Sequence, residues 1–161
     1  MQRPPRSRQD RLLTPGLLVR AYLFLGSCEA VAAMAAFLFV LSATGWQWGQ
    51  ELSVTDLRYR QATTACLTAI VLMQVVNVHL CRSRRTSIVS RPLFGNALIT
   101  SGIVAEVALI LAIDYTAAGN AVFGTAAIGR GAWLVVLPFA GAMLALDEAQ
   151  KAFVRWRRVE R

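Results

Sequence analysis

Residues 62–87 of this chain read ATTACLTAIVLMQVVNVHLCRSRRTS, an apolar run with two amide side chains near its end, followed by a burst of arginines. The apolar part, residues 62–81, spans about 20 residues and would be roughly 30 Å long as a helix, which matches the hydrocarbon thickness of a bilayer. Gln74 and Asn77 lie three residues apart and share one face of that helix. Because an amide in lipid needs hydrogen-bond partners, the stretch predicts a membrane helix that faces a polar neighbour.

The composition of the whole chain is typical of a membrane protein. Its 161 residues are 56% apolar and 16% charged, with a mean hydropathy of +0.49. An ordinary soluble domain of this length is more highly charged. Further apolar runs lie at about residues 17–44, 97–115 and 131–146. The sequence therefore predicts an all-α membrane protein in which four transmembrane helices form a bundle.

The basic residues indicate how the chain crosses the membrane. The net charge is +8, but the arginines gather at the ends of apolar runs and form no nucleic-acid-binding motif, so we expect no nucleic-acid partner. Basic residues precede the first run and follow the second and fourth, whereas only Arg58, Arg60 and Arg130 lie on the other side. By the positive-inside rule, both termini are expected in the cytoplasm and the spans in the plasma (inner) membrane.

The segments outside the spans complete the expected organisation. Residues 1–12 are rich in Pro and Arg and predict a basic, disordered tail, and residues 13–161 then form the four-helix domain, with a basic cytoplasmic end at 147–161. LGSC at residues 25–28 is similar to a bacterial lipoprotein cleavage site. However, Arg20 interrupts the apolar region before it and the apolar run continues past Cys28, so we expect no cleavage.

Polar side chains lie inside the expected spans. Counted from the cytoplasmic edge at about 1.5 Å per residue, Glu29, Gln74 and Glu106 all lie roughly 12–14 Å deep, on three different helices. Together with Asn77, they would offer carboxylate and amide oxygens to a hard cation or a shared proton. The alternative is that these groups only hydrogen-bond one helix to another.

The expected spans also contain a proline, Pro138, and end in an acidic residue, Asp114. Pro138 lies at a similar depth in the fourth span, where it cannot donate to the carbonyl of Leu134 and would kink the helix. The freed carbonyl could join the polar cluster, or the kink could serve packing alone. Asp114 ends the third span beside Tyr115, where we expect it to reach water at the interface.

Motifs for catalysis are missing from the sequence. It contains no Gly-rich phosphate loop, no nucleophile elbow and no HExxH. We therefore expect this chain to catalyse no hydrolysis by itself and to hold no cofactor.

Several stretches resemble the C-terminal membrane helices of cation-transporting P-type ATPases. QVVNVHLCRSRRTSIVSRPLF at residues 74–94 resembles their eighth transmembrane helix and the following cytoplasmic loop. GIVAEVALILAIDYT at residues 102–116 is similar to the ninth helix, and LDEAQKAFVR at residues 146–155 to the inner end of the tenth. RAYLFLG at residues 20–26 fits the seventh less specifically. The resemblance thus covers essentially the whole chain, as helices seven to ten of such a pump.

The resemblance implies roles for some of the polar residues. Gln74 falls where calcium pumps have a carboxylate ligand and sodium-potassium pumps a glutamine, and Asn77 falls where these have an amide or an acid. Glu106 corresponds to a ninth-helix glutamate linked with a sodium site, whereas Glu29 has no counterpart. These positions imply an ion path for a cation that the sequence does not identify.

The resemblance also implies what such a chain would need in order to pump. The phosphorylated aspartate in DKTGT, the TGES loop and the first six helices are absent from the sequence, so we expect no ATP-driven transport by this chain alone. The first hypothesis is therefore a support domain that associates with the remaining helices and catalytic domains on another chain. The alternatives are a non-enzymatic membrane interaction protein or pump remnant, and a small oligomeric channel around Glu106.

Overall fold

Four helices long and apolar enough to cross a membrane are present in the computed structural model, which describes residues 18–81 and 95–159. They cover Arg20–Ala43, Leu57–Cys81, Ala97–Tyr115 and Arg130–Phe153. These two described ranges contain no strand, so the expected all-α, four-span architecture is confirmed. The predicted tail at residues 1–12 and the arginines at residues 82–91 lie outside the described residues.

The first span changes its helical form along its length. It contains a π-helical segment, η1 (Arg20–Leu25), which continues into α2 (Gly26–Ala43). The Gly26 N–H donates to the carbonyl of Ala21, five residues earlier, as a π-helix requires. The buried face of α2 is rich in alanine, which lets its backbone approach a neighbouring helix closely.

The second span, α3 (Leu57–Cys81), begins at Leu57 and not at residue 62, where the apolar run starts. Asp56 explains this earlier start because its Oδ1 accepts a 2.8 Å hydrogen bond from the backbone N–H of Arg58, as an N-cap does. The carbonyl of Asp56 also accepts from the N–H of Arg60 at 3.0 Å. The helix therefore takes in both arginines that precede the apolar run.

The third span, α4 (Ala97–Tyr115), leads directly into a short helix, α5 (Ala117–Phe123). The side chain of Asn96 caps α4 by accepting from the N–H groups of Leu98 and Ile99. Thr116 separates the two helices, and its hydroxyl accepts from the N–H of Gly119 at 3.0 Å. The chain thus turns sharply at the end of α4.

The fourth span belongs to a single long helix, α6 (Arg130–Val159), which continues well past residue 146, where the apolar run ends. Its buried residues recur at helical spacing and therefore form one face. They are Ala132, Val136, Met143, Asp147 and Lys151.

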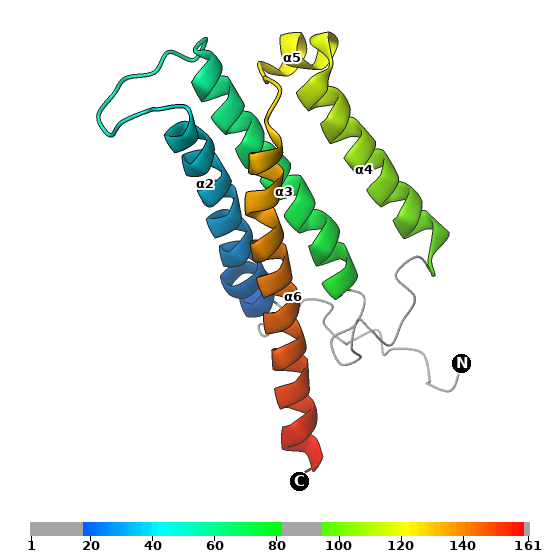
Figure 1. Cartoon of the computed structure of the whole chain (residues 1–161). Helices are drawn as coiled ribbons and strands as arrows, with labels where there is room; N and C mark the ends of the chain where they lie inside the picture. Colours follow the sequence, from blue (N-terminus) through cyan, green and yellow to red (C-terminus); the bar gives the residue numbers. More distant parts are fainter. Residues whose placement is uncertain (1–17, 82–94, 160–161) are drawn as a thin grey trace.

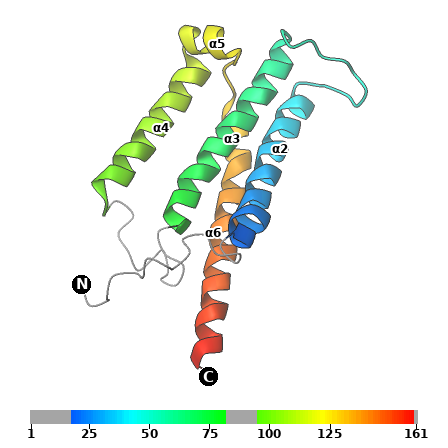
Figure 2. The same ribbon diagram turned by 180° about the vertical axis from the view of Figure 1, so that it is seen from behind.

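Three of the spans form the hydrophobic core, and the fourth lies beside them. α2, α3 and α6 pack against one another, whereas α4 lies next to α3 (Figure 1). The view from behind shows the same arrangement (Figure 2). Only Ile110 and Asp114 of α4 are buried, so the half of α4 nearer to α5 makes the contact. The start of α2 and the ends of α3 and α6 lie at one end of the bundle, opposite α5 (Figure 1).

Candidate functional site

The structure joins two of the predicted polar residues across α2 and α3. The Gln74 Nε2 donates a 2.9 Å hydrogen bond to the Glu29 Oε1, and both side chains are half-buried. Among the described residues, no hydrogen bond reaches the Glu29 Oε2 or the Gln74 Oε1. The pair therefore presents one carboxylate oxygen and one amide oxygen, which are the ligand types that a hard cation prefers.

Asn77 is half-buried on the same helix as Gln74 but makes no hydrogen bond to another helix within the described ranges. Its Oδ1 accepts a 3.3 Å contact from the thiol of Cys81, one turn further along α3. A thiol is a weak donor, so this contact binds the amide only loosely.

Glu106 lies half-buried on α4 and forms no hydrogen bond or ion pair with residues 18–81 or 95–159. The ring of two carboxyls and two amides that the common depth predicted is thus present only as the Glu29–Gln74 pair. Nor do the described residues contain a group of three His, Cys, Asp or Glu side chains that could hold a metal ion.

Pro138 lies on the exposed side of α6, together with Leu134 and Leu137. The buried face of the same helix is formed by residues such as Ala132, Val136 and Met143. The proline and the position of the carbonyl that it frees are therefore on the side of α6 that points away from the packed helices.

The expectation that Asp114 reaches water is wrong. Asp114 is fully buried, and its Oδ2 lies 2.7 Å from the hydroxyl of Thr68 on α3. The segment after α5 folds back over this end of α4: the hydroxyl of Thr125 donates to the carbonyl of Ile113, and the N–H of Ala126 donates to the hydroxyl of Thr64. The position of Asp114 in the sequence could not show that the segment after α5 covers it.

Arg60 fixes the same segment from α3. Its Nε donates to the carbonyl of Gly124 at 2.9 Å, and its Nη2 donates to the carbonyls of Asn120 and Thr125 at 2.9 and 2.6 Å. A guanidinium is suited to the carbonyl-rich end of a helix because the helix dipole is negative there. In the sequence, this arginine is recognisable only as a charge on one side of the membrane.

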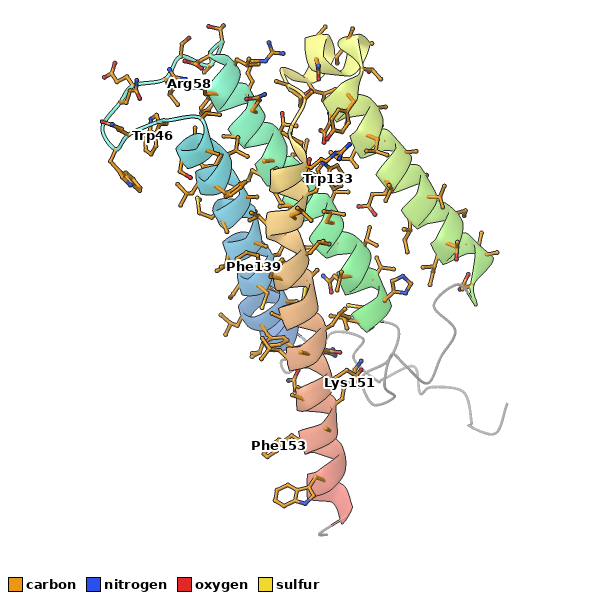
Figure 3. All side chains as sticks on the ribbon, viewed as in Figure 1. Trp46, Arg58, Trp133, Phe139, Lys151 and Phe153 are labelled. Atoms are coloured by element: carbon orange, nitrogen blue, oxygen red, sulfur yellow. The ribbon has the colours of Figure 1, made fainter. Side chains whose placement is uncertain are left out.

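A group of charges that sequence reasoning missed joins the first and last spans. Asp147 is fully buried and forms ion pairs with Arg20 and, at 2.7 Å, with Lys151. Lys151 also lies 3.4 Å from Glu148 and points away from the exposed Phe153 (Figure 3). The i, i+4 spacing of Asp147 and Lys151 was visible in the sequence, but the pairing with Arg20 required the fold.

Comparison with known proteins gives consistent matches. Residues 1–153 match the family described as "Cation transporting ATPase, C-terminus". The chain is similar to potassium-transporting ATPase alpha chain 2 of Rattus norvegicus, with 26% identity over 180 aligned positions that cover 96% of this chain and 17% of the rat protein. It is also similar to the probable cation-transporting ATPase F of Mycobacterium bovis, with 34% identity over 143 positions, 89% of this chain and 14% of that protein. The chain thus spans less than a fifth of the length of these relatives.

Proposed function

The chain belongs to the cation-transporting P-type ATPases as their C-terminal membrane region, and we propose that it forms a support domain beside the cation path of such a pump. In this proposal Gln74, Asn77 and Glu106 face the path, with Glu29 as a companion of Gln74. The observation that carries it is Glu106, a half-buried carboxyl group within a span that forms no hydrogen bond or ion pair with the described residues.

Glu106 and Asn77 support a role beyond packing. A carboxyl group within a membrane span is costly unless it meets a polar partner or a water-filled cavity. Glu106 has no partner among the described residues, and Asn77 accepts only from the thiol on its own helix. Neither side chain therefore ties two of this chain's described helices together by a hydrogen bond, which is what a packing role would require.

The second candidate function is a membrane interaction domain in which the polar residues only stabilise helix packing. The Glu29–Gln74 pair favours it, because interhelical hydrogen bonds of this kind contribute about 0.6 kcal/mol each, and up to about 1.7 kcal/mol, in membrane proteins. This candidate predicts that substitutions of these residues lower stability and leave cation transport unchanged.

The support-domain proposal includes a partner and a location. The partner is the remaining helices and catalytic domains of a P-type ATPase, on another chain, and the location is the plasma (inner) membrane with both termini in the cytoplasm. The concentration of arginine and lysine near the start of the first span and the end of the last supports this orientation. Reporter fusions after residue 161 and within residues 45–55 should be active on opposite sides of the membrane.

Co-expression with the ATPase part of a pump tests the proposal. The chain would be purified with a P-type ATPase that carries the first six helices, and ATP-driven uptake of K⁺, Na⁺, Ca²⁺ and Mg²⁺ into vesicles would be measured. We expect Gln74→Leu and Glu106→Gln to weaken the apparent affinity for the transported cation by about tenfold or more, equivalent to about 1.4 kcal/mol.

Matched controls separate a path residue from a packing residue. Gln47→Leu and Glu51→Gln make the same chemical changes at exposed positions between the first two spans and should leave the apparent cation affinity unchanged. If Gln74→Leu and Glu106→Gln also leave affinity unchanged while lowering stability, the packing function replaces the path function. If the two chains do not co-purify, the proposed partner is wrong.

A further inference from the structure

Asp114 is a buried carboxyl group with an incomplete set of hydrogen bonds. Its side chain is fully buried, and its Oδ2 lies 2.7 Å from the hydroxyl oxygen of Thr68. Its Oδ1 is buried without a hydrogen-bond partner among the described residues. A carboxylate in such surroundings lacks most of the donors that an anion needs when it leaves water.

The hydrogens available around Asp114 can be counted. The hydroxyl of Thr68 carries one hydrogen but lies within bonding distance of two acceptors, the carbonyl of Thr64 at 2.9 Å and the Asp114 Oδ2 at 2.7 Å. Threonine in a helix commonly donates to the carbonyl four residues earlier. If Thr68 does so, the hydrogen in its bond with Asp114 must come from the carboxyl group.

Thr64, one turn earlier on α3, follows the same pattern. Its hydroxyl donates to the carbonyl of Arg60 at 2.6 Å and accepts from the N–H of Ala126 at 3.0 Å. With a neutral Asp114, the hydroxyl of Thr68 would likewise accept one hydrogen bond and donate another. Asp114 would donate to Thr68, and Thr68 would donate to the carbonyl of Thr64. Each hydroxyl would then be both a donor and an acceptor, which is the arrangement that strengthens a hydrogen-bond chain.

The charged groups near Asp114 are already committed elsewhere or lie on the surface. On α3, the guanidinium of Arg60 binds the carbonyls of Asn120, Gly124 and Thr125, and Arg58 pairs with Asp56. α5 and residues 124–129 contain no charged side chain, and α6 begins with the exposed Arg130. On α4 itself, the hydroxyl of Tyr115 donates to the carbonyl of Ile128. Asp114 therefore has no ion pair within the described part of the chain.

We propose that Asp114 is a proton-binding site at the α5 end of the bundle, with the proton on Oδ2 and donated to the hydroxyl of Thr68. The ligand is a proton taken from water. When the proton returns to water, Thr68 must turn its hydrogen from the carbonyl of Thr64 to the Asp114 Oδ2, so the state of the carboxyl is coupled to the hydrogen bonding of α3. This site is separate from the Glu29–Gln74 pair and does not depend on the proposed ion path.

Infrared spectroscopy of the whole chain in lipid bilayers tests the proposal directly. The chain would be prepared with aspartate labelled with carbon-13 at the side-chain carboxyl, because a protonated carboxylic acid has a carbonyl stretching band that a carboxylate lacks. At neutral pH we expect one acid band that shifts on labelling. The sequence contains four aspartates, Asp10, Asp56, Asp114 and Asp147.

Variants assign the band. Asp114→Asn should remove it, Asp56→Asn should leave it in place, and Thr68→Val should shift it because the acceptor of the proton's hydrogen bond is lost. Thr68→Ser keeps the hydroxyl and should leave the band near its original frequency. If the unsubstituted chain shows no label-sensitive acid band at neutral pH, or if the band survives Asp114→Asn, the proposal is overturned. The presence or absence of the acid band is read from the labelled, unsubstituted chain, so this outcome does not depend on whether a variant folds.

Discussion

Arg20 and Asp147 form an ion pair, although 127 positions of the chain separate them. The pair ties the π-helical start of the first span to α6, just past the apolar part of the last span. Asp147 is fully buried and also pairs with Lys151 at 2.7 Å, so one carboxylate serves two cations. This ion pair therefore holds the start of the first span against α6.

Replacing this carboxylate should be strongly destabilising. Asp147→Asn would leave Arg20 and the almost fully buried Lys151 without their shared counter-charge. Because removing one partner of a buried ion pair leaves an uncompensated charge, we expect the free energy of unfolding to fall by about 3 kcal/mol. Unfolding in mixed detergent micelles, followed by circular dichroism, would measure the loss.

Two comparisons show whether the burial of this pair matters. Asp56→Asn breaks a more exposed ion pair, with Arg58, and should change the stability little. The double substitution Arg20→Asp with Asp147→Arg should recover little of the loss from Asp147→Asn, because it would place a second cation beside the buried Lys151. Equal stability of Asp147→Asn and the unsubstituted chain would show that the ion pair contributes nothing.

The corner between α4 and α5 should accept only glycine at position 119. A Cβ on Gly119 would lie 2.7 Å from the Ile113 Cα and 2.8 Å from the Ile113 carbonyl oxygen, both of them backbone atoms that cannot rotate away. We expect Gly119→Ala to lower the free energy of unfolding by about 2 kcal/mol, the effect of overpacking. Gly102→Ala, where the new Cβ meets nothing within 4 Å, should be neutral or stabilising. An equal effect of both substitutions would contradict this account.

Arg60→Lys should loosen the segment after α5 while keeping the positive charge. The planar guanidinium of Arg60 donates to three carbonyls at once from two of its nitrogens. The ammonium of lysine has a single nitrogen and cannot match that geometry. We expect the free energy of opening of this segment to fall by about 2 kcal/mol, since a hydrogen bond to a charged group contributes about 1.5–3 kcal/mol. Faster hydrogen exchange at residues 117–126 would report it. Arg130→Lys, at the exposed start of α6, should leave the exchange rates unchanged.

The stability that Asp56 gives to the start of α3 should decrease at acidic pH. The side-chain hydrogen bond from Arg58 holds the pKa of Asp56 below its ordinary value of 3.8. A carboxyl with a lowered pKa in the folded state stabilises that state fully above its unfolded pKa, and this contribution is lost as the pH falls through the folded pKa. In an NMR titration, Arg58→Gln should raise the pKa of Asp56, and Arg58→Lys should raise it less. An unchanged pKa in Arg58→Gln would contradict the assigned cause.

The number and type of spans could be predicted from the sequence because hydrophobic length is a property of each segment alone. Helix ends were less predictable, as Asp56 shows: a capping side chain starts α3 before the apolar run does. α6 likewise continues past its apolar run, through residues Asp147 and Lys151 that are buried by pairing with charge and not by hydrophobicity.

The polar residues show a different limit of sequence reasoning. Equal depth predicted that Glu29 and Gln74 would lie near each other, and the structure joins them. Depth says nothing about which way a helix is rotated or which helices are neighbours, so it could not show that Glu106 lacks a partner among the described residues. The prediction that Asp114 reaches water is wrong because Thr68 and the segment after α5, which cover its side chain, come from elsewhere in the fold.

The coupling between Glu29 and Gln74 should be measurable and should decide how much of their role is structural. In a double-substitution cycle with Glu29→Ala and Gln74→Ala, we expect a coupling energy of about 0.6 kcal/mol, and at most about 2 kcal/mol, because the membrane-embedded unfolded state also offers polar partners. The same cycle with Glu29 and Asn77, which do not hydrogen-bond to each other, should give a coupling near zero. Equal coupling in the two cycles would mean that the 2.9 Å contact adds nothing specific to stability. A small coupling for Glu29 and Gln74 together with a large loss of cation affinity in the pump would instead separate their contribution to ion binding from their contribution to packing.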